Sequence, residues 1–194
     1  MKKLLLVGAL SMAALGLSLG GCDTMGMDHG KMHENMWAGV TKAVAVLQPT
    51  QGNTVAGTIW FDSVADGVRV HGDVTGLAAG SSHGFHIHEF GDASSANGSA
   101  AGGHYNPEGH THGGPTDAQH HAGDLGNITA DASGKATVDV TIKGISIAGM
   151  MDPIIGRGVV VHANKDDFTS PPAPATPGNS GPRIAVGVIG VAKP

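Results

Sequence analysis

Residues 84–92, GFHIHEFGD, place two histidines one residue apart in a segment that alternates like a β-strand. Successive side chains of a strand point to opposite faces, so His86 and His88 share one face while Phe85 and Ile87 share the other. If the two apolar side chains face a hydrophobic core, the imidazoles face outward together and provide half of a four-ligand transition-metal site. Two solvated histidines are the alternative for so short a pattern, and the rest of the chain has to decide between the two.

Short segments of β-branched and alternating residues, separated by glycine-rich turns, recur from Thr41 onward. No segment has the periodicity of a long amphipathic helix, so the sequence predicts an all-β fold, an antiparallel sandwich or barrel. His71 falls on the outward face of its strand and is interpreted as a solvated surface residue. Besides the strand around 84–88, the predicted strands are 43–47, 54–61, 67–74, 136–143, 158–163 and 184–192.

Two long segments, 89–124 and 163–182, lack strand character. Loops of this length without secondary structure are usually functional or disordered. The first is rich in glycine and histidine, which indicates metal binding, and the second is rich in proline, which indicates control of access to a site. We therefore expect two long functional loops on the all-β domain.

The N-terminus has the features of an export signal. Lys2 and Lys3 precede an apolar run that is too short to favour a permanent membrane helix, and small residues lead to Cys22, the only cysteine. LGGC resembles the lipobox of bacterial lipoproteins, whose cysteine becomes the lipidated first residue; an ordinary signal peptide with an incidental cysteine is the alternative. We expect residues 1–21 to be a lipoprotein signal peptide. Cys22 would then anchor the protein to a membrane of the bacterial cell envelope, facing the periplasm or the outside.

Residues 22–38 have neither strand nor helix periodicity, and we expect them to form a tether that precedes a single domain, 39–194. Thioether and imidazole ligands favour copper, so this stretch could collect that metal, although a plain linker with incidental methionines explains the composition equally well. The residues concerned are Met25, Met27, His29, Met32, His33 and Met36.

Charge and cysteine usage limit the possible partners and covalent links. The net charge is −5, and the predicted signal contains two lysines and no acids, so its removal leaves a still more acidic chain. Binding of nucleic acid requires a concentrated basic surface, and we expect no nucleic-acid partner. A chain with one cysteine cannot form an internal disulfide, which is unusual for an exported protein.

The histidines from 86 to 121, with Asp124 and His162, are more potential ligands than one tetrahedral metal can use, which indicates two adjacent metals. In chain order, GFHIHEFGD, GGHYNP, HGGPTD, HAGDLGNITAD, GRGVVVHANKDD and GNSGPRIAVGVIG resemble the motifs of the copper/zinc superoxide dismutases, across essentially the whole of 39–194. The resemblance implies an eight-stranded antiparallel Greek-key β-barrel, an immunoglobulin-like sandwich with two long functional loops.

The resemblance also implies a copper and a zinc that share one ligand, His104. Asp166 matches a carboxylate that links a copper ligand to a zinc ligand and fixes both rings. His83, His110 and His120 match no ligand position and are expected to be loop or surface residues. The implied ligands are His86, His88, His104 and His162 for copper, and His104, His112, His121 and Asp124 for zinc.

The implied activity is the dismutation of superoxide to dioxygen and hydrogen peroxide by a redox-cycling copper bridged to a structural zinc. Arg183 matches the family arginine that orients the anion, a role suited to a fixed guanidinium fork, and His104 would supply a proton. A surface arginine paired with an acid is the alternative for Arg183. A related protein that only sequesters or delivers copper is the alternative function, but such a carrier would not need Arg183 beside an open copper position.

Three features depart from the family pattern. The family normally joins a cysteine of the first loop to one of the last strand, whereas this chain has Gly98 and Val186 in those regions. The segment between His88 and His104 is one residue longer than in the animal-type enzymes, and SPPAPATP replaces a charged stretch of the second loop. These departures affect loop rigidity, steering and the possible homodimer, and we expect zinc to be the main clamp of the first loop.

Overall fold

The computed structural model describes residues 39–170 and 177–194. The predicted signal peptide, Cys22 and the Met/His-rich tether lie outside the described residues. No helix in the described part is long and apolar enough to cross a membrane. The strands are β1 Lys42–Pro49, β2 Ala56–Val64, β3 Gly67–Thr75, β4 Ser82–His88, β5 Asp124–Thr129, β6 Ala136–Ile142, β7 Gly158–His162, β8 Arg183–Val188 and β9 Gly190–Val191, with 3-10 turns at Ser99–Ala101 and Pro177–Asn179.

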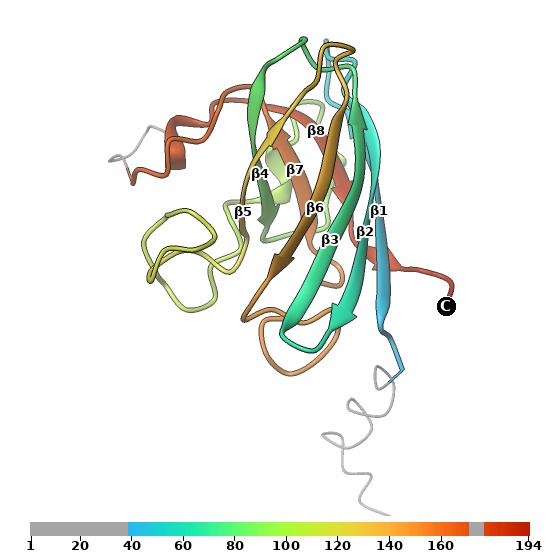
Figure 1. The fold of residues 1–194 in the computed structure, drawn as a ribbon, viewed down its shortest axis with the longest axis vertical. Coiled ribbons are helices and arrows are strands. Elements are labelled where there is room, and N and C mark those ends of the chain that lie inside the picture. The colour runs from blue at the N-terminus through green and yellow to red at the C-terminus, as the bar shows by residue number, and fades with distance from the viewer. Residues whose placement is uncertain (1–38, 171–176) are drawn as a thin grey trace, which may run out of the picture.

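The strands form one antiparallel sheet in the order β5-β4-β7-β8-β1-β2-β3-β6, and the short β9 pairs with β1. The end strands β5 and β6 also contact each other, so the sheet curls into a nearly closed barrel (Figure 1). The connections from β3 to β4 and from β6 to β7 cross the barrel, which is the Greek-key arrangement. The predicted all-β, eight-stranded Greek-key barrel is confirmed.

Four strands, β1, β2, β3 and β6, bury alternate residues and expose those between them. This is the pattern of a sheet with one face on the core and one in water. Removing the inward side chains from water favours folding by about 25 cal/mol for each Å² of apolar surface. The inward residues of these strands include Ala45, Leu47, Ile59, Phe61, Val68, Val70 and Val138.

Strands β4 and β7 differ because both of their faces are buried. Phe85 and Ile87 face the core as predicted, yet His86 and His88 on the opposite face are only 0% and 1% exposed. The described parts of the two long loops lie on the side of the barrel formed by β4, β5 and β7 (Figure 1). The imidazoles are therefore outside the barrel and still inside the protein.

The predicted strands agree with the observed ones to within a few residues, with two differences. Strand β5 was not predicted because Gly126 and Asn127, both weak strand formers, interrupt its apolar pattern. It forms nevertheless, since it pairs with β4 and buries Leu125 and Ile128 in the core. The last predicted strand divides into β8 and β9 at Ile189, whose N–H donates to the carbonyl of Arg157.

Candidate metal centre

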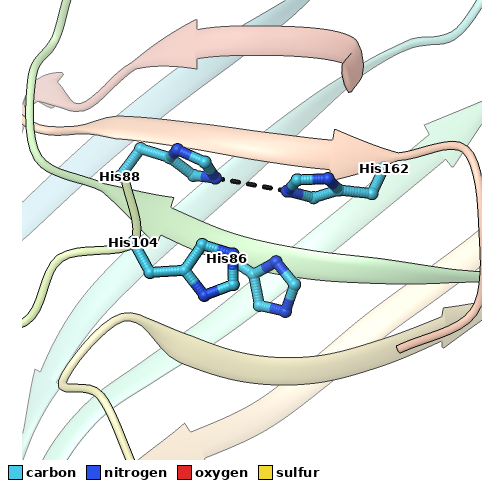
Figure 2. Close-up of side chains that lie close together, drawn as sticks. All are labelled: His86, His88, His104 and His162. Atoms are coloured by element: carbon cyan, nitrogen blue, oxygen red, sulfur yellow. Dashed lines mark hydrogen bonds between the residues drawn. The ribbon is translucent and has the colours of Figure 1, made fainter. Parts of the chain in front are cut away.

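Four buried imidazoles from three parts of the chain meet beside the barrel (Figure 2). His86 and His88 extend from β4, and His162 ends β7. His104 belongs to the first long loop, which a β-bridge between residues 88 and 104 holds against β4. Each ring has a nitrogen within 4.8 Å of such an atom in each of the others, so the four nitrogens can reach one ion.

A second buried group shares His104 with the first and adds His112, His121 and Asp124. Oδ1 of Asp124 lies 3.0 Å from Nδ1 of His104, 3.0 Å from Nδ1 of His112 and 3.3 Å from Nδ1 of His121. The other oxygen, Oδ2, accepts the backbone N–H groups of His121 and Gly113 at 2.8 and 3.2 Å. These two bonds keep Oδ1 turned toward the three imidazoles. Because Nδ1 of His104 faces Asp124, the other nitrogen of this ring, Nε2, is free to act as a ligand in the first group.

Hydrogen-bond logic fixes the tautomers of two rings in the first group. Nδ1 of His88 lies 3.0 Å from the Gly102 carbonyl, and Nδ1 of His162 lies 3.0 Å from the Gly181 carbonyl. A carbonyl only accepts, so each Nδ1 has the hydrogen. Burial lowers the pKa of His88 well below its usual value and that of His162 to about 3, so both rings are neutral. Their Nε2 atoms, joined by the dashed line in Figure 2, lie 3.2 Å apart. In these tautomers each Nε2 has a lone pair and no hydrogen, an arrangement that suits a cation between them.

His86 provides a second indication of a cation. Its Nε2 lies 2.6 Å from Oδ2 of Asp166, so this nitrogen has the hydrogen and Nδ1 has the lone pair. Nδ1 is buried and is the one buried side-chain nitrogen or oxygen among residues 39–170 and 177–194 without a hydrogen-bond partner. Buried polar atoms are normally paired, and imidazole nitrogens are good ligands for copper and zinc. The side chains present therefore fit both metals.

Asp166 connects the two groups. Its Oδ2 contacts His86, and its Oδ1 lies 3.0 Å from Nε2 of His112. Asn127 holds the backbone of Asp166 with two hydrogen bonds, of 2.7 and 2.9 Å. A β-carbon on Gly178, which has a φ of 64°, would collide with the Asp166 carboxylate. Asn127 and Gly178 were not among the expected site residues, although Asn127 lies in the motif HAGDLGNITAD and Gly178 in GNSGP.

The electrostatics of the centre favour bound cations. Burial raises the pKa of Asp124, but hydrogen bonds from three imidazoles outweigh it and lower this pKa below its usual range. The pKa of Asp166 is also lowered, because its hydrogen bonds with His112 and His86 outweigh the effect of burial. Burial lowers the pKa of His112, but the two carboxylates on opposite nitrogens raise it to about 9. Both carboxylates are therefore ionised at neutral pH, and buried negative charge attracts a metal.

A cavity of about 440 Å³ reaches the first group and is bordered by Arg183. The guanidinium donates to the carbonyls of Gly98 and Gly102 and retains further N–H donors. Burial lowers the pKa of Arg183, but a guanidinium remains charged at neutral pH. Arg183 is the only permanently charged residue among the described residues that line the cavity: His88, Asn97, Ser99, Gly103, His104, His162, Pro177, Gly181, Pro182 and Arg183.

The other histidines of the domain lie mostly as expected. His71 is half-buried and bonds Oδ2 of Asp62 at 2.8 Å, and His110 and His120 lie partly exposed on the first loop. The expected loop or surface position of His83 is wrong. His83 belongs to β4, is 7% exposed, and donates from Nδ1 to the carbonyl of His162 at 2.8 Å. Its polar ring is accommodated because Nε2 also bonds Oγ of Ser81 at 2.7 Å.

Comparison with known proteins agrees with this geometry. Residues 55–189 match the family described as copper/zinc superoxide dismutase. The extracellular Cu-Zn superoxide dismutase of Brugia pahangi is 39% identical over 173 residues, an alignment that covers 82% of this chain and 84% of that protein. The corresponding enzyme of Onchocerca volvulus is 44% identical over 168 residues, covering 83% and 80%.

A solved structure described as that of the clock protein EA4 superposes with a TM-score of 0.70. It is 42% identical, and the match covers 78% of this chain and 95% of that one. Likeness of sequence and of fold therefore extends over most of the domain, and the buried histidine groups fit the two metals that the family binds. The chain belongs to the copper/zinc superoxide dismutase family and is an enzyme that uses copper and zinc to dismutate superoxide to dioxygen and hydrogen peroxide.

Proposed function

We propose that copper is held by Nδ1 of His86 and by Nε2 of His88, His104 and His162. Zinc is held by Nδ1 of His104, His112 and His121 and by Oδ1 of Asp124. The observation that supports this division is His104, whose Nδ1 faces the Asp124 group while Nε2 remains for the other three rings. Three imidazoles and a carboxylate make a closed site, which is typical of structural zinc.

When bound, copper would supply the one-electron couple between successive superoxide ions, and Nδ1 of His104 would hold zinc in place of a proton. Two superoxide ions and two protons give one dioxygen and one hydrogen peroxide. Arg183 attracts the anion into the cavity and orients it with the N–H groups that the carbonyls of Gly98 and Gly102 leave available. Nε2 of His104 would take up and donate a proton only while it is not bound to copper, and Asp166 keeps His86 and His112 in their tautomers.

Metal analysis of two variants tests this assignment. His86→Ala should lose most of its copper and keep its zinc, because His86 belongs to the proposed copper group and is absent from the proposed zinc group of His104, His112, His121 and Asp124. His112→Ala should lose zinc first. Elemental analysis after loading with both metals gives the two contents, and His71→Ala, at a half-exposed histidine outside both groups, is the control. Loss of zinc alone from His86→Ala would contradict the assignment.

We infer that the chain is exported as a bacterial lipoprotein without the family disulfide, with residues 1–21 as its signal, Cys22 as its lipid anchor and 22–38 as its tether. The N-terminal sequence supports this proposal, and the two relatives are named extracellular enzymes. The domain then faces the periplasm or the outside of the cell.

Replacement of Cys22 by serine should release the protein from membranes, because the thioether that bears the lipid cannot form. In cells fed a labelled fatty acid, the full-length chain should take up label and the Cys22→Ser variant should take up none. Label in the variant, or none in the parent, would rule out this anchor.

We propose a homodimer through an apolar surface patch formed by Val46, Phe90, Val188 and Val191, which are between 42% and 55% exposed. The segments that bear these side chains are neighbours, since β1 pairs with both β8 and β9, and Gly91, next to Phe90, lies beside Val188. A monomer rarely exposes so many large apolar side chains in one place, and a second copy offers a matching surface.

Val188→Glu should shift the protein to monomers, because each interface would then bury an unpaired carboxylate. Sedimentation measured over a range of concentrations shows the mass. Val64→Glu is a matched control, since Val64 is 41% exposed and lies at the end of β2, at its turn into β3. A parent protein that remains monomeric at high concentration contradicts the proposal.

A further inference from the structure

The two segments that hold Arg183 have no covalent link in this chain. Arg183 begins β8, and its guanidinium donates to the carbonyls of Gly98 and Gly102 on the first loop. A β-carbon on Gly98 would lie only 2.7 Å from Cγ2 of Val186, so the segments touch where a disulfide could have joined them. The orientation of the guanidinium therefore depends on non-covalent contacts that keep β8 and the loop in register.

The turn between β1 and β2, residues 50–53, contacts both segments. The hydroxyl of Thr50 donates to the carbonyl of Arg183 at 2.8 Å, and the Thr50 N–H donates to the Ile184 carbonyl at 3.1 Å. The N–H of the next residue, Gln51, donates to the carbonyl of Ala96 at 2.7 Å. Two consecutive residues thus bind the strand that bears Arg183 and the loop that supplies its two acceptors.

The Thr50 hydroxyl is itself oriented. Thr50 is 8% exposed, and its Oγ1 accepts a hydrogen bond of 2.9 Å from Nδ2 of Asn53. The Asn53 N–H closes the turn on the carbonyl of Thr50 at 3.0 Å. A hydroxyl has one hydrogen, so with Asn53 on its oxygen the Thr50 hydrogen points to Arg183. The side chains form a directed chain from Asn53 through Thr50 to the Arg183 backbone.

An apolar cluster also joins the two segments, but it has a different effect. Ala101 of the loop is fully buried against Val160 of β7 and Val186 of β8. Apolar contact resists separation of the segments, yet it is non-directional and leaves their register free to shift. The hydrogen bonds of the 50–53 turn are directional, so they can fix the register that the apolar contact leaves free.

We propose that the 50–53 turn is a positioning element for the anion-binding guanidinium. Thr50 fixes the backbone of Arg183, and Gln51 fixes the loop whose carbonyls hold its side chain. The turn thereby takes the place of a covalent link between loop and strand. This inference rests on the proposed role of Arg183 in binding the anion.

Binding of azide, a small anion, to the copper- and zinc-loaded protein tests the inference. Thr50→Val keeps the shape of the side chain and removes the hydroxyl, so the azide dissociation constant should rise about twofold to tenfold, the effect of one lost hydrogen bond. Thr50→Ser should restore azide binding. Thr75→Val is the matched control, because the Thr75 hydroxyl also bonds a carbonyl, that of Ala56 at 3.3 Å, on strands that do not pair with β8.

A double-mutant cycle separates positioning from a general effect on folding. Thr50→Val should weaken azide binding in the parent and have no further effect in Arg183→Ala, because the residue through which it acts is absent. Equal weakening in both backgrounds, or unchanged binding in Thr50→Val with Arg183 present, overturns the inference. Unchanged azide binding in Arg183→Ala alone would instead remove the proposed role of Arg183.

Discussion

Replacing Arg183 by alanine is expected to lower the rate constant for superoxide by about tenfold or more and to leave the metal content unchanged. The guanidinium borders the cavity, and its hydrogen bonds go to the backbone carbonyls of Gly98 and Gly102 rather than to a metal ligand. Its charge has no substitute among the described residues that line the cavity, because none of the others is permanently charged. In sequence, 168–182 contains no charged residue.

Two further substitutions separate the charge of Arg183 from its hold on the loop. Arg183→Lys keeps a positive charge without the planar fork and should recover only part of the rate. Arg183→Gln keeps an amide donor for one carbonyl but no charge, and should resemble alanine if attraction of the anion dominates. Pulse radiolysis gives the rate constants, and elemental analysis gives the metals. A fully metallated Arg183→Ala protein that reacts as fast as the parent would show that another group guides the anion.

Removal of zinc is expected to destabilise the fold and to release one half of the first loop. A metal present at about 100 to 1,000 times its dissociation constant adds roughly 3 to 4 kcal/mol to the free energy of unfolding, and that amount is lost without it. The ligands His104, His112, His121 and Asp124 bracket residues 104–124, so the ion holds this half at both of its ends. Thiol reductants should have no effect, because Cys22 is the only cysteine.

The other half of the loop, residues 91–103, should stay ordered without zinc. The structure shows contacts that do not involve the metal: Ala101 is fully buried, Gln51 binds the carbonyl of Ala96, and Arg183 binds two carbonyls. We therefore expect zinc to clamp only the second half of the first loop, residues 104–124, and not the whole loop.

Hydrogen exchange of the zinc-free protein, compared with the zinc-loaded one, measures this difference segment by segment. Fast exchange should appear in 106–122 and should be absent from 91–103 and from the barrel strands. Tyr105 and Gly123 should also stay protected, because their N–H groups bond the carbonyls of Ile87 and Tyr105. Restoring zinc serves as the control. Loss of protection throughout 91–123 would show that the contacts of Ala96 and Ala101 are too weak to replace a disulfide, and unchanged protection everywhere would show that zinc is not a clamp.

Much of the barrel could be predicted from the sequence because strand alternation is a local property. The period of two placed Phe85 and Ile87 on the core and the histidines on the opposite face, and the structure agrees. Strand β5 could not be predicted in the same way. Gly126 and Asn127 weaken its local preference, and the strand is stabilised by pairing with β4, nearly forty residues away in sequence.

The histidines show where local pattern stops being sufficient. His86 and His88 are outward on their strand, and the sequence cannot say whether water or protein lies beyond; the loops from residue 89 and residue 163 bury them. His83 looked like a surface residue because its partner is the backbone of His162, which only the pairing of β4 with β7 brings close. Asn127 and Asp166 likewise meet only in the folded chain.

The sequence by itself determined the strand pattern, the residue types available as metal ligands, and the impossibility of an internal disulfide, because each follows from which residues are present and how they are spaced. Tertiary structure alone decided which imidazole nitrogen faces which group, how Asp166 connects them, and how the 50–53 turn reaches Arg183. The physical reason is that these contacts join residues distant in sequence, and their geometry arises from the Greek-key crossing of the strands.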